Sequence, residues 1–177
     1  MKKIIALFLL LTVVVFTFGC NNDVVDDTLP EEMPDDFYFT LSWGAFGRSS
    51  YDSKTGKLVK DSYVYDVDNF STTYYLSDYE MKYIYDMIRD LHLEQYPDEF
   101  DDNDFITSDP YLTYSLSVEG GGFYKTVKAN EVGIAYLEDS AGKTKKAKDY
   151  LKTIDEIVNI LTRTDEWNEL SDWIDYD

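Results

Sequence analysis

The sequence has few of the residues on which small secreted and catalytic domains usually depend. Its 177 residues include a single cysteine and a single histidine. No disulfide can therefore form within the chain, although disulfides are the usual reinforcement of small secreted domains. A nucleophilic triad has no support, because His92 has no serine elbow or second histidine near it in the sequence. Basic residues are also scarce, 16 against 35 acidic ones, and the net charge of −19 argues against binding nucleic acid.

The single cysteine, Cys20, follows an apolar segment at the start of the chain. Two lysines stand within residues 1–3, and residues 4–18 are predominantly apolar. This stretch of about 15 residues is short for a bilayer-crossing helix, which needs about 20. A basic start followed by such a stretch is typical of an export signal. The pair Gly19 and Cys20 resembles the end of a bacterial lipoprotein signal peptide, in which a small residue precedes a cysteine that receives lipid.

This resemblance implies that residues 1–19 are removed and that Cys20 is lipidated. Thr17 and Phe18 depart from the family pattern, which has an aliphatic residue three positions before the cysteine and a small residue two before it. An uncleaved transmembrane helix over residues 4–18 is the alternative. Removing residues 1–19 also removes Lys2 and Lys3, and the net charge becomes −21. Anionic lipid would repel so acidic a domain, so the lipid on Cys20 is expected to hold it at the extracytoplasmic face of the cell membrane.

The segment between the cysteine and the first apolar alternation is predicted to be a flexible acidic linker. Residues 20–36 contain Pro30 and Pro34 and show no helical or strand period. A chain of this kind behaves as a flexible coil. We therefore expect one folded domain over residues 37–177, which is long enough to bury a core without disulfides.

Alternation of apolar residues predicts strands in two groups. In the first group, residues 37–43 alternate, Gly56 turns a hairpin, residues 57–66 return, and residues 71–76 form a short strand. In the second group, residues 111–119 alternate, a triple glycine turns the chain, and residues 123–128 form the hairpin partner. A further strand is predicted over residues 132–137.

Two helices are predicted, one after each group of strands. Ser77 and Glu80 form a capping box at the start of the first helix, which is closed by Pro97 and holds His92 in its last turn. The second helix covers residues 144–161, and a short closing helix begins at Thr164. Together the elements predict an α+β fold of ββαββα order, in which two main helices pack on one face of a largely antiparallel sheet.

Two charged segments could bind ligands. An acidic loop over residues 98–104 has oxygen ligands for calcium, but it lacks the central glycine and terminal glutamate of an EF-hand loop. A solvated loop is therefore the favoured interpretation. A basic cluster at the start of the second helix could contact an anionic partner such as a wall polymer, although pairing with the acidic surface is favoured. The candidate calcium ligands are Asp98, Asp101, Asp102 and Asp104, and the basic cluster is Lys143, Lys145, Lys146 and Lys148.

Tyrosine is unusually frequent, with sixteen residues in the chain. Tyr63 and Tyr65 share a face of a predicted strand and are candidates for a binding surface, as are Tyr74 and Tyr75. Packing within the sheet is the favoured interpretation for both pairs, because tyrosine suits strands and cross-strand contacts. An exposed aromatic patch in the structure would instead favour binding.

Residues 50–60, 94–100 and 165–170 are similar to segments of small uncharacterised lipoproteins of Gram-positive bacteria, and this resemblance implies location only. No residue is identified as catalytic or as a cofactor ligand. The predicted function is therefore a membrane-tethered, non-enzymatic binding or interaction module whose partner is an extracellular protein or a wall polymer. The alternatives are an exported carboxylate-dependent hydrolase, which would need two carboxylates with separated pKa values, and an inhibitor or immunity-type protein.

Overall fold

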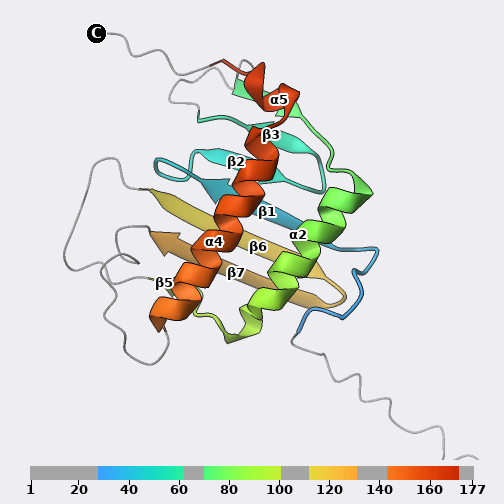
Figure 1. The fold of residues 1–177 in the computed structure, drawn as a ribbon, viewed down its shortest axis with the longest axis vertical. Coiled ribbons are helices and arrows are strands. Elements are labelled where there is room, and N and C mark those ends of the chain that lie inside the picture. The colour runs from blue at the N-terminus through green and yellow to red at the C-terminus, as the bar shows by residue number, and fades with distance from the viewer. Residues whose placement is uncertain (1–27, 62–69, 101–111, 131–142, 172–177) are drawn as a thin grey trace, which may run out of the picture.

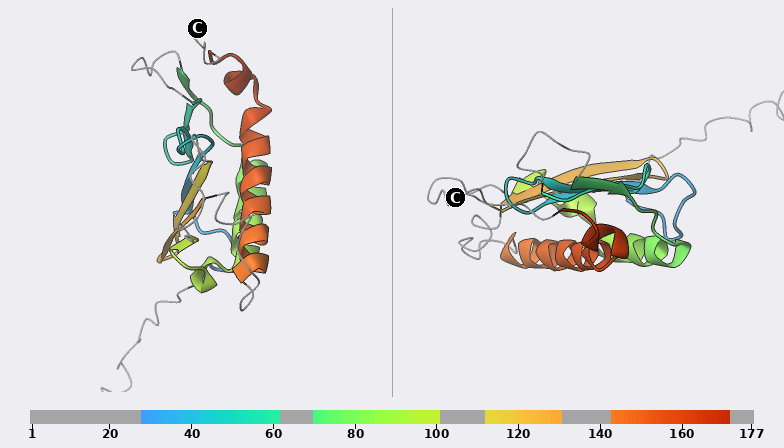
Figure 2. Two further views of the ribbon diagram at one scale, coloured as in Figure 1. Left: turned by 90° about the vertical axis from the view of Figure 1, so that its left-hand side faces the viewer. Right: turned by 90° about the horizontal axis from the view of Figure 1, so that it is seen from above.

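The computed structural model describes residues 28–61, 70–100, 112–130 and 143–171, and within these ranges it has two layers (Figure 1). One layer is a seven-stranded sheet of order β4-β3-β2-β1-β6-β7-β5. Every pair of neighbouring strands is antiparallel except β5 and β7. The other layer holds the long helices α2 and α4, which lie side by side on one face of the sheet (Figures 1 and 2). The predicted α+β fold with two main helices on one face is confirmed.

Within the described residues, more strands are present than the predicted ββαββα order contains, with four before α2 and three between α2 and α4. The strands are β1 (Tyr38–Trp43), β2 (Ser49–Asp52), β3 (Lys57–Val59), β4 (Ser71–Thr73), β5 (Glu99–Phe100), β6 (Thr113–Gly120) and β7 (Phe123–Asn130). The helices are α2 (Asp78–Leu91), the 3₁₀ helix η2 (Leu93–Gln95), α4 (Lys143–Thr162) and the short α5 (Asp165–Asn168).

The core lies between the sheet and the helices. Strand β1 is central and points Phe39, Leu41 and Trp43 towards the helices, as the alternation predicted. Its intervening residues, such as Thr40 and Ser42, lie on the opposite face of the sheet. The neighbouring strands β2 and β6 also place serines there. An antiparallel sheet tolerates this arrangement because only one of its faces needs to be buried.

Glycine turns fix the register of two hairpins, as predicted. Gly56 has a φ of 70° between β2 and β3. A Cβ at this position would lie 2.9 Å from the carbonyl oxygen of Tyr74. Both the positive φ and the close approach of Tyr74 therefore require glycine at position 56. Gly121 and Gly122 turn the chain between β6 and β7, which pair along their whole length.

Helix α2 begins at the predicted capping box. The Ser77 hydroxyl accepts a hydrogen bond from the amide of Glu80, and the Glu80 carboxylate accepts one from the amide of Ser77. The helix ends at Leu91, earlier than predicted. His92 adopts the left-handed conformation as its C-cap, with φ 56° and an exposed side chain. The prediction that His92 lies in the last turn and that Pro97 closes the helix is therefore wrong, because the left-handed residue ends the helix first.

Helix α4 matches its prediction to within one residue at each end. Tyr150 ties this helix to the sheet. Its buried hydroxyl accepts a hydrogen bond from the amide of Leu116 in β6 and donates one to the carbonyl of Val127 in β7. The closing helix α5 has the predicted cap, since the Thr164 hydroxyl accepts a hydrogen bond from the amide of Trp167.

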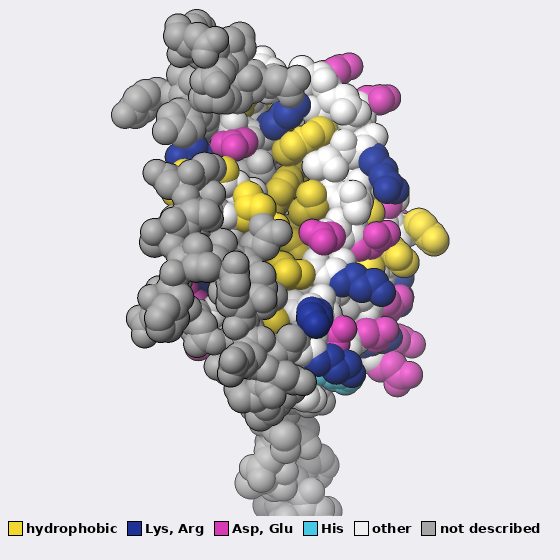
Figure 3. Space-filling view, turned by 60° about the vertical axis from the view of Figure 1, so that its left-hand side comes forward, with side chains coloured by type: hydrophobic (Ala, Val, Ile, Leu, Met, Phe, Trp, Pro, Cys, Tyr) yellow, Lys and Arg dark blue, Asp and Glu magenta, His cyan; other side chains and the backbone are white. Residues whose placement is uncertain are grey.

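The surface carries charges of both signs. Figure 3 shows a side of the molecule on which Lys and Arg side chains are interspersed with acidic ones, next to a strip of hydrophobic side chains. No continuous basic area is visible on this side among the described residues. This distribution fits the interpretation that basic side chains pair locally with an acidic surface.

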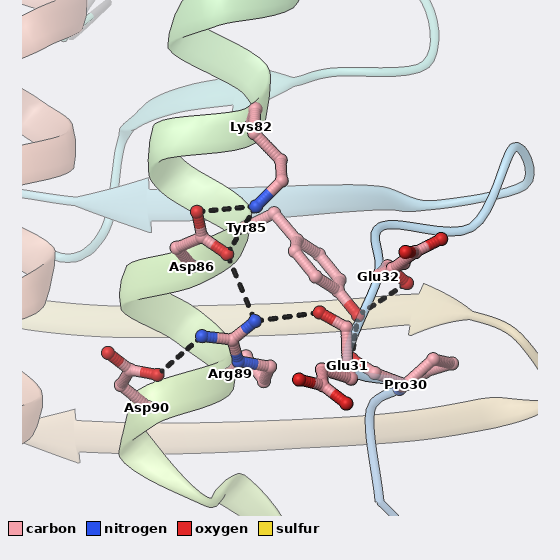
Figure 4. Close-up of polar contacts among 8 residues, drawn as sticks. All are labelled: Pro30, Glu31, Glu32, Lys82, Tyr85, Asp86, Arg89 and Asp90. Atoms are coloured by element: carbon pink, nitrogen blue, oxygen red, sulfur yellow. Dashed lines mark hydrogen bonds and ion pairs between the residues drawn. The ribbon is translucent and has the colours of Figure 1, made fainter.

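The predicted linker is partly wrong, because residues 28–36 pack on the domain. Leu29 and Met33 lie against the core. The Tyr85 hydroxyl of α2 donates a hydrogen bond to the carbonyl of Pro30, and the Arg89 guanidinium donates one to the carbonyl of Glu31 at 2.7 Å (Figure 4). We call residues 28–36 the N-terminal arm. Composition could not reveal that the arm packs on the domain, because the donors to the carbonyls of Pro30 and Glu31 lie more than fifty residues away in the sequence.

Several predictions fall outside the described residues. These are the apolar start of the chain with Cys20, the strand over residues 132–137, and the continuation of the strand from residue 57 beyond residue 61. No helix among the described residues is both long and apolar enough to cross a membrane.

Candidate binding surface

Three exposed tyrosines lie on α2 or shortly before it. Across the described residues, four large hydrophobic side chains are exposed, and they are Tyr75, Tyr79, Tyr83 and Tyr124. The first three have exposed fractions of 67%, 80% and 43%. Residues four apart are neighbours on a helix surface, so Tyr79 and Tyr83 share one face of α2. Tyr75 lies outside the helix, beside Gly56 in the turn between β2 and β3. We call Tyr75, Tyr79 and Tyr83 the tyrosine ridge.

The ridge is exposed because of the way α2 sits on the sheet. Ile84, Tyr85 and Ile88 point into the core, and the positions of Tyr79 and Tyr83 lie on the far side of the helix from them. Tyr75 lies just before the helix, with its ring over the open Cα of Gly56. The sheet therefore covers the face of α2 that holds Ile84, Tyr85 and Ile88, and it leaves the face with Tyr79 and Tyr83 exposed.

A groove between α2 and α4 continues from the ridge. Its volume is about 520 Å³, and Tyr83 forms part of its wall. Apolar atoms come from α2 and from Tyr96, which follows η2, and charged side chains come from both helices. The lining residues are Tyr83, Met87, Asp90, Leu91, Tyr96, Asp149, Lys152, Thr153 and Glu156.

The groove is acidic. Of its four charged lining residues, Asp90, Asp149 and Glu156 are acids and Lys152 is the base. Asp90 makes an ion pair with Arg89 at 3.0 Å. Asp149 and Glu156 make none within the described part of the chain. Burial raises the pKa of the Tyr96 hydroxyl to about 12, and the negative charge of Asp149 acts in the same direction.

The predicted basic cluster does not form a single site. Lys145 and Lys148 are exposed at the start of α4. Lys146 instead turns to the end of the groove, where its ammonium donates a hydrogen bond to the carbonyl of Gln95 at 2.7 Å and lies 5.8 Å from the ring centre of Tyr96. The side chain of Lys143 lies outside the described residues.

The candidate calcium loop is described only at its start. Asp98 makes an ion pair with Lys125 at 2.5 Å, and the hydrogen bond from Lys125 holds the pKa of this carboxyl below its usual value. Asp101, Asp102 and Asp104 lie outside the described residues. Among the residues that are described, no three acidic, histidine or cysteine side chains gather in a way that could hold a metal ion.

The predicted tyrosine surface has a different location from the observed one. Tyr63 and Tyr65 lie outside the described residues. Of the second pair, Tyr74 packs partly against the core, whereas Tyr75 is exposed and belongs to the ridge. Sequence reasoning missed Tyr79 and Tyr83. Their spacing of four residues, away from the apolar face of a well-capped helix, was the signal that could have identified them.

No protein-family model matches this chain, and no curated protein matches it by sequence.

Proposed function

We propose that this protein is an exported lipoprotein, held by a lipid on Cys20 at the extracytoplasmic face of the membrane, and that it acts as a non-enzymatic binding module. The tyrosine ridge and the adjoining groove are its binding surface. The observation that carries the proposal is the exposure of Tyr79 and Tyr83 on one face of α2, beside a groove between α2 and α4 that Tyr83 borders.

Isolated exposed apolar side chains are ordinary on protein surfaces. Neighbouring exposed tyrosines on one helix face are different, because tyrosine supplies a large, rigid contact area with a polar tip and is enriched among the residues that dominate binding energy. Here Tyr79 and Tyr83 share a face of α2, and Tyr83 also lines the groove. Met87 in the groove has a flexible side chain that can adapt its shape to a partner. The surface therefore offers both an exposed contact area and a recess.

The N-terminal arm shortens the proposed tether. Because residues 28–36 are packed on the domain, only residues 20–27 separate the lipidated cysteine from the fold. Eight residues span at most about 28 Å even when fully extended. The domain would thus work close to the membrane surface, and its partner is expected to be an extracytoplasmic macromolecule that reaches this zone.

A photo-crosslinking amino acid placed at position 79 tests the binding surface in intact cells. We expect position-specific capture of a partner at Tyr79. The matched control is position 124, because Tyr124 is also an exposed tyrosine, with a fraction of 68% against 80% for Tyr79, but lies in β7. Capture that is equal at the two positions, or absent at both, would contradict the proposal.

The tether is tested separately by Cys20→Ser. We expect this variant to leave the membrane fraction while its circular dichroism spectrum stays unchanged. Continued membrane association would support an uncleaved helix over residues 4–18 instead.

A further inference from the structure

We infer that the groove between α2 and α4 receives a cationic, amphipathic protein segment. This inference rests on the proposed function and specifies the chemistry of the partner.

Acidic side chains stand on both walls of the groove. Asp90 stands on the α2 wall, and Asp149 and Glu156 stand on the α4 wall. Asp149 and Glu156 make no ion pair within the described residues, although Lys152 lines the same groove between them on α4. Asp149 is exposed and Glu156 is partly exposed, so both carboxylates are open to a cationic side chain of a partner, and salt should weaken this attraction. Lysine or arginine side chains of a bound segment would supply the missing partners.

Part of the groove is apolar. Met87, Leu91 and the ring of Tyr96 contribute to its lining. A hydrated metal ion or a purely ionic polymer would leave this surface without a matching contact. A segment with apolar and cationic side chains on the same face would cover both, as amphipathic helices do when they bind in grooves.

Charge also excludes other occupants. A second copy of this chain would bring a further net charge of −19 to the acidic groove. An anionic wall polymer would meet the same repulsion. The exposed lysines at the start of α4, Lys145 and Lys148, do not belong to the groove lining.

The dimensions set the length of the segment. From Tyr79 to Leu91 the surface follows about twelve residues of α2, or roughly 18 Å at 1.5 Å per residue. An occupant that follows the whole surface therefore needs about three helical turns. This length is consistent with a single short helix.

The test uses the folded chain with a 14-residue amphipathic peptide of leucine and lysine, labelled for fluorescence anisotropy. Its counterpart with glutamate in place of lysine is the charge control. We expect the lysine peptide to bind and the glutamate peptide not to bind. The variant Asp149→Asn with Glu156→Gln should weaken binding of the lysine peptide by about tenfold or more, since both proposed ion pairs are lost.

A matched variant controls for the general acidity of the protein. Glu99→Gln with Glu169→Gln removes the same charge from exposed positions in β5 and after α5, away from the groove. We expect this variant to change affinity by less than about twofold. Equal weakening by the two double variants would show that the peptide responds only to net charge, and it would overturn the inference.

A second pair of variants tests the apolar contact. Tyr83→Ser should weaken the lysine peptide, whereas Tyr124→Ser should not. Binding of polyphosphate in preference to the lysine peptide would also overturn the inference. Neither result would affect the crosslinking test at Tyr79, so failure of the cationic partner can be distinguished from failure of the binding module.

Discussion

The hydroxyl of Tyr150 offers a direct test of how the helical layer is joined to the sheet. It accepts a hydrogen bond from the Leu116 amide at 3.1 Å and donates one to the Val127 carbonyl at 2.7 Å. All three residues are fully buried. Burial also raises the pKa of this hydroxyl well above its ordinary value. Replacing Tyr150 by phenylalanine removes only the hydroxyl.

The expected cost follows from the groups that lose their partner. Leaving one buried polar group unsatisfied costs about 1–3 kcal/mol. Two groups lose a partner here, but Leu116 and Val127 face each other in the ladder between β6 and β7 and can recover part of the loss. The phenylalanine ring keeps the contacts with Tyr96 and Phe100. We therefore expect Tyr150→Phe to lower the free energy of unfolding by about 2 kcal/mol, or about 6 °C in Tm for a domain of this size.

Urea unfolding followed by circular dichroism measures this loss. The matched control is Tyr83→Phe, which removes a hydroxyl from a half-exposed side chain and should change the free energy of unfolding by less than about 0.5 kcal/mol. Hydrogen exchange adds a local measurement, because the Leu116 amide should exchange faster in Tyr150→Phe. A variant as stable as the wild type, with unchanged exchange at Leu116, would refute the reasoning.

Three further predictions concern stability. Ser77→Ala should lower the free energy of unfolding by about 1 kcal/mol because the capping box is lost, and an unchanged thermal midpoint would contradict this. Removing the N-terminal arm, residues 28–36, should cost about 2–4 kcal/mol through lost apolar burial and orphaned hydrogen-bond donors, and a shortened chain that unfolds at the same urea concentration would refute it. Burial is the main cause that raises the pKa values of Tyr51, Tyr74 and Tyr96 to about 12. Because the neutral hydroxyls are favoured in the fold, stability should be intact below pH 10 and lost as the pH rises from 10 towards 12. Near-ultraviolet absorbance should show these tyrosines ionising together with unfolding, and ionisation near pH 10 in a still folded protein would contradict the assignment.

The two sides of α2 have separate roles in this protein. On one side, Tyr85 and Arg89 bind the N-terminal arm through its carbonyl groups. The other side presents the tyrosine ridge and one wall of the groove. Since the arm leads towards Cys20, the proposed anchor and the proposed binding surface depend on the same helix. Loss of α2 would therefore disturb both.

Local signals account for the parts of the fold that sequence reasoning predicted correctly. The capping box of Ser77 and Glu80, the glycine turn at Gly56 and the apolar periodicity of α4 each act within a few residues. Alternation along β1 likewise reveals which of its residues are buried. These features persist because local backbone chemistry and the tertiary fold favour the same conformation.

The signals that failed were also local. The acidic, proline-containing composition of residues 20–36 predicted a flexible linker throughout, but part of it is packed against the domain. At the end of α2, Pro97 predicted a later boundary than the left-handed His92 produces. Contacts with the distant residues Tyr85 and Arg89 hold residues 28–36 on the domain. The left-handed backbone conformation of His92 ends α2.

The two long helices, the glycine hairpins and the inward face of β1 can be predicted from the amino-acid sequence alone. Three features become evident only in the folded protein: β1 lies between β2 and β6, the N-terminal arm binds α2, and the hydroxyl of Tyr150 joins β6 to β7. The tertiary structure also decided which of the sixteen tyrosines are exposed beside an acidic groove. The physical reason is that turns, caps and periodicity depend on neighbouring residues, whereas burial and hydrogen-bond pairing depend on segments that only the folded chain brings together.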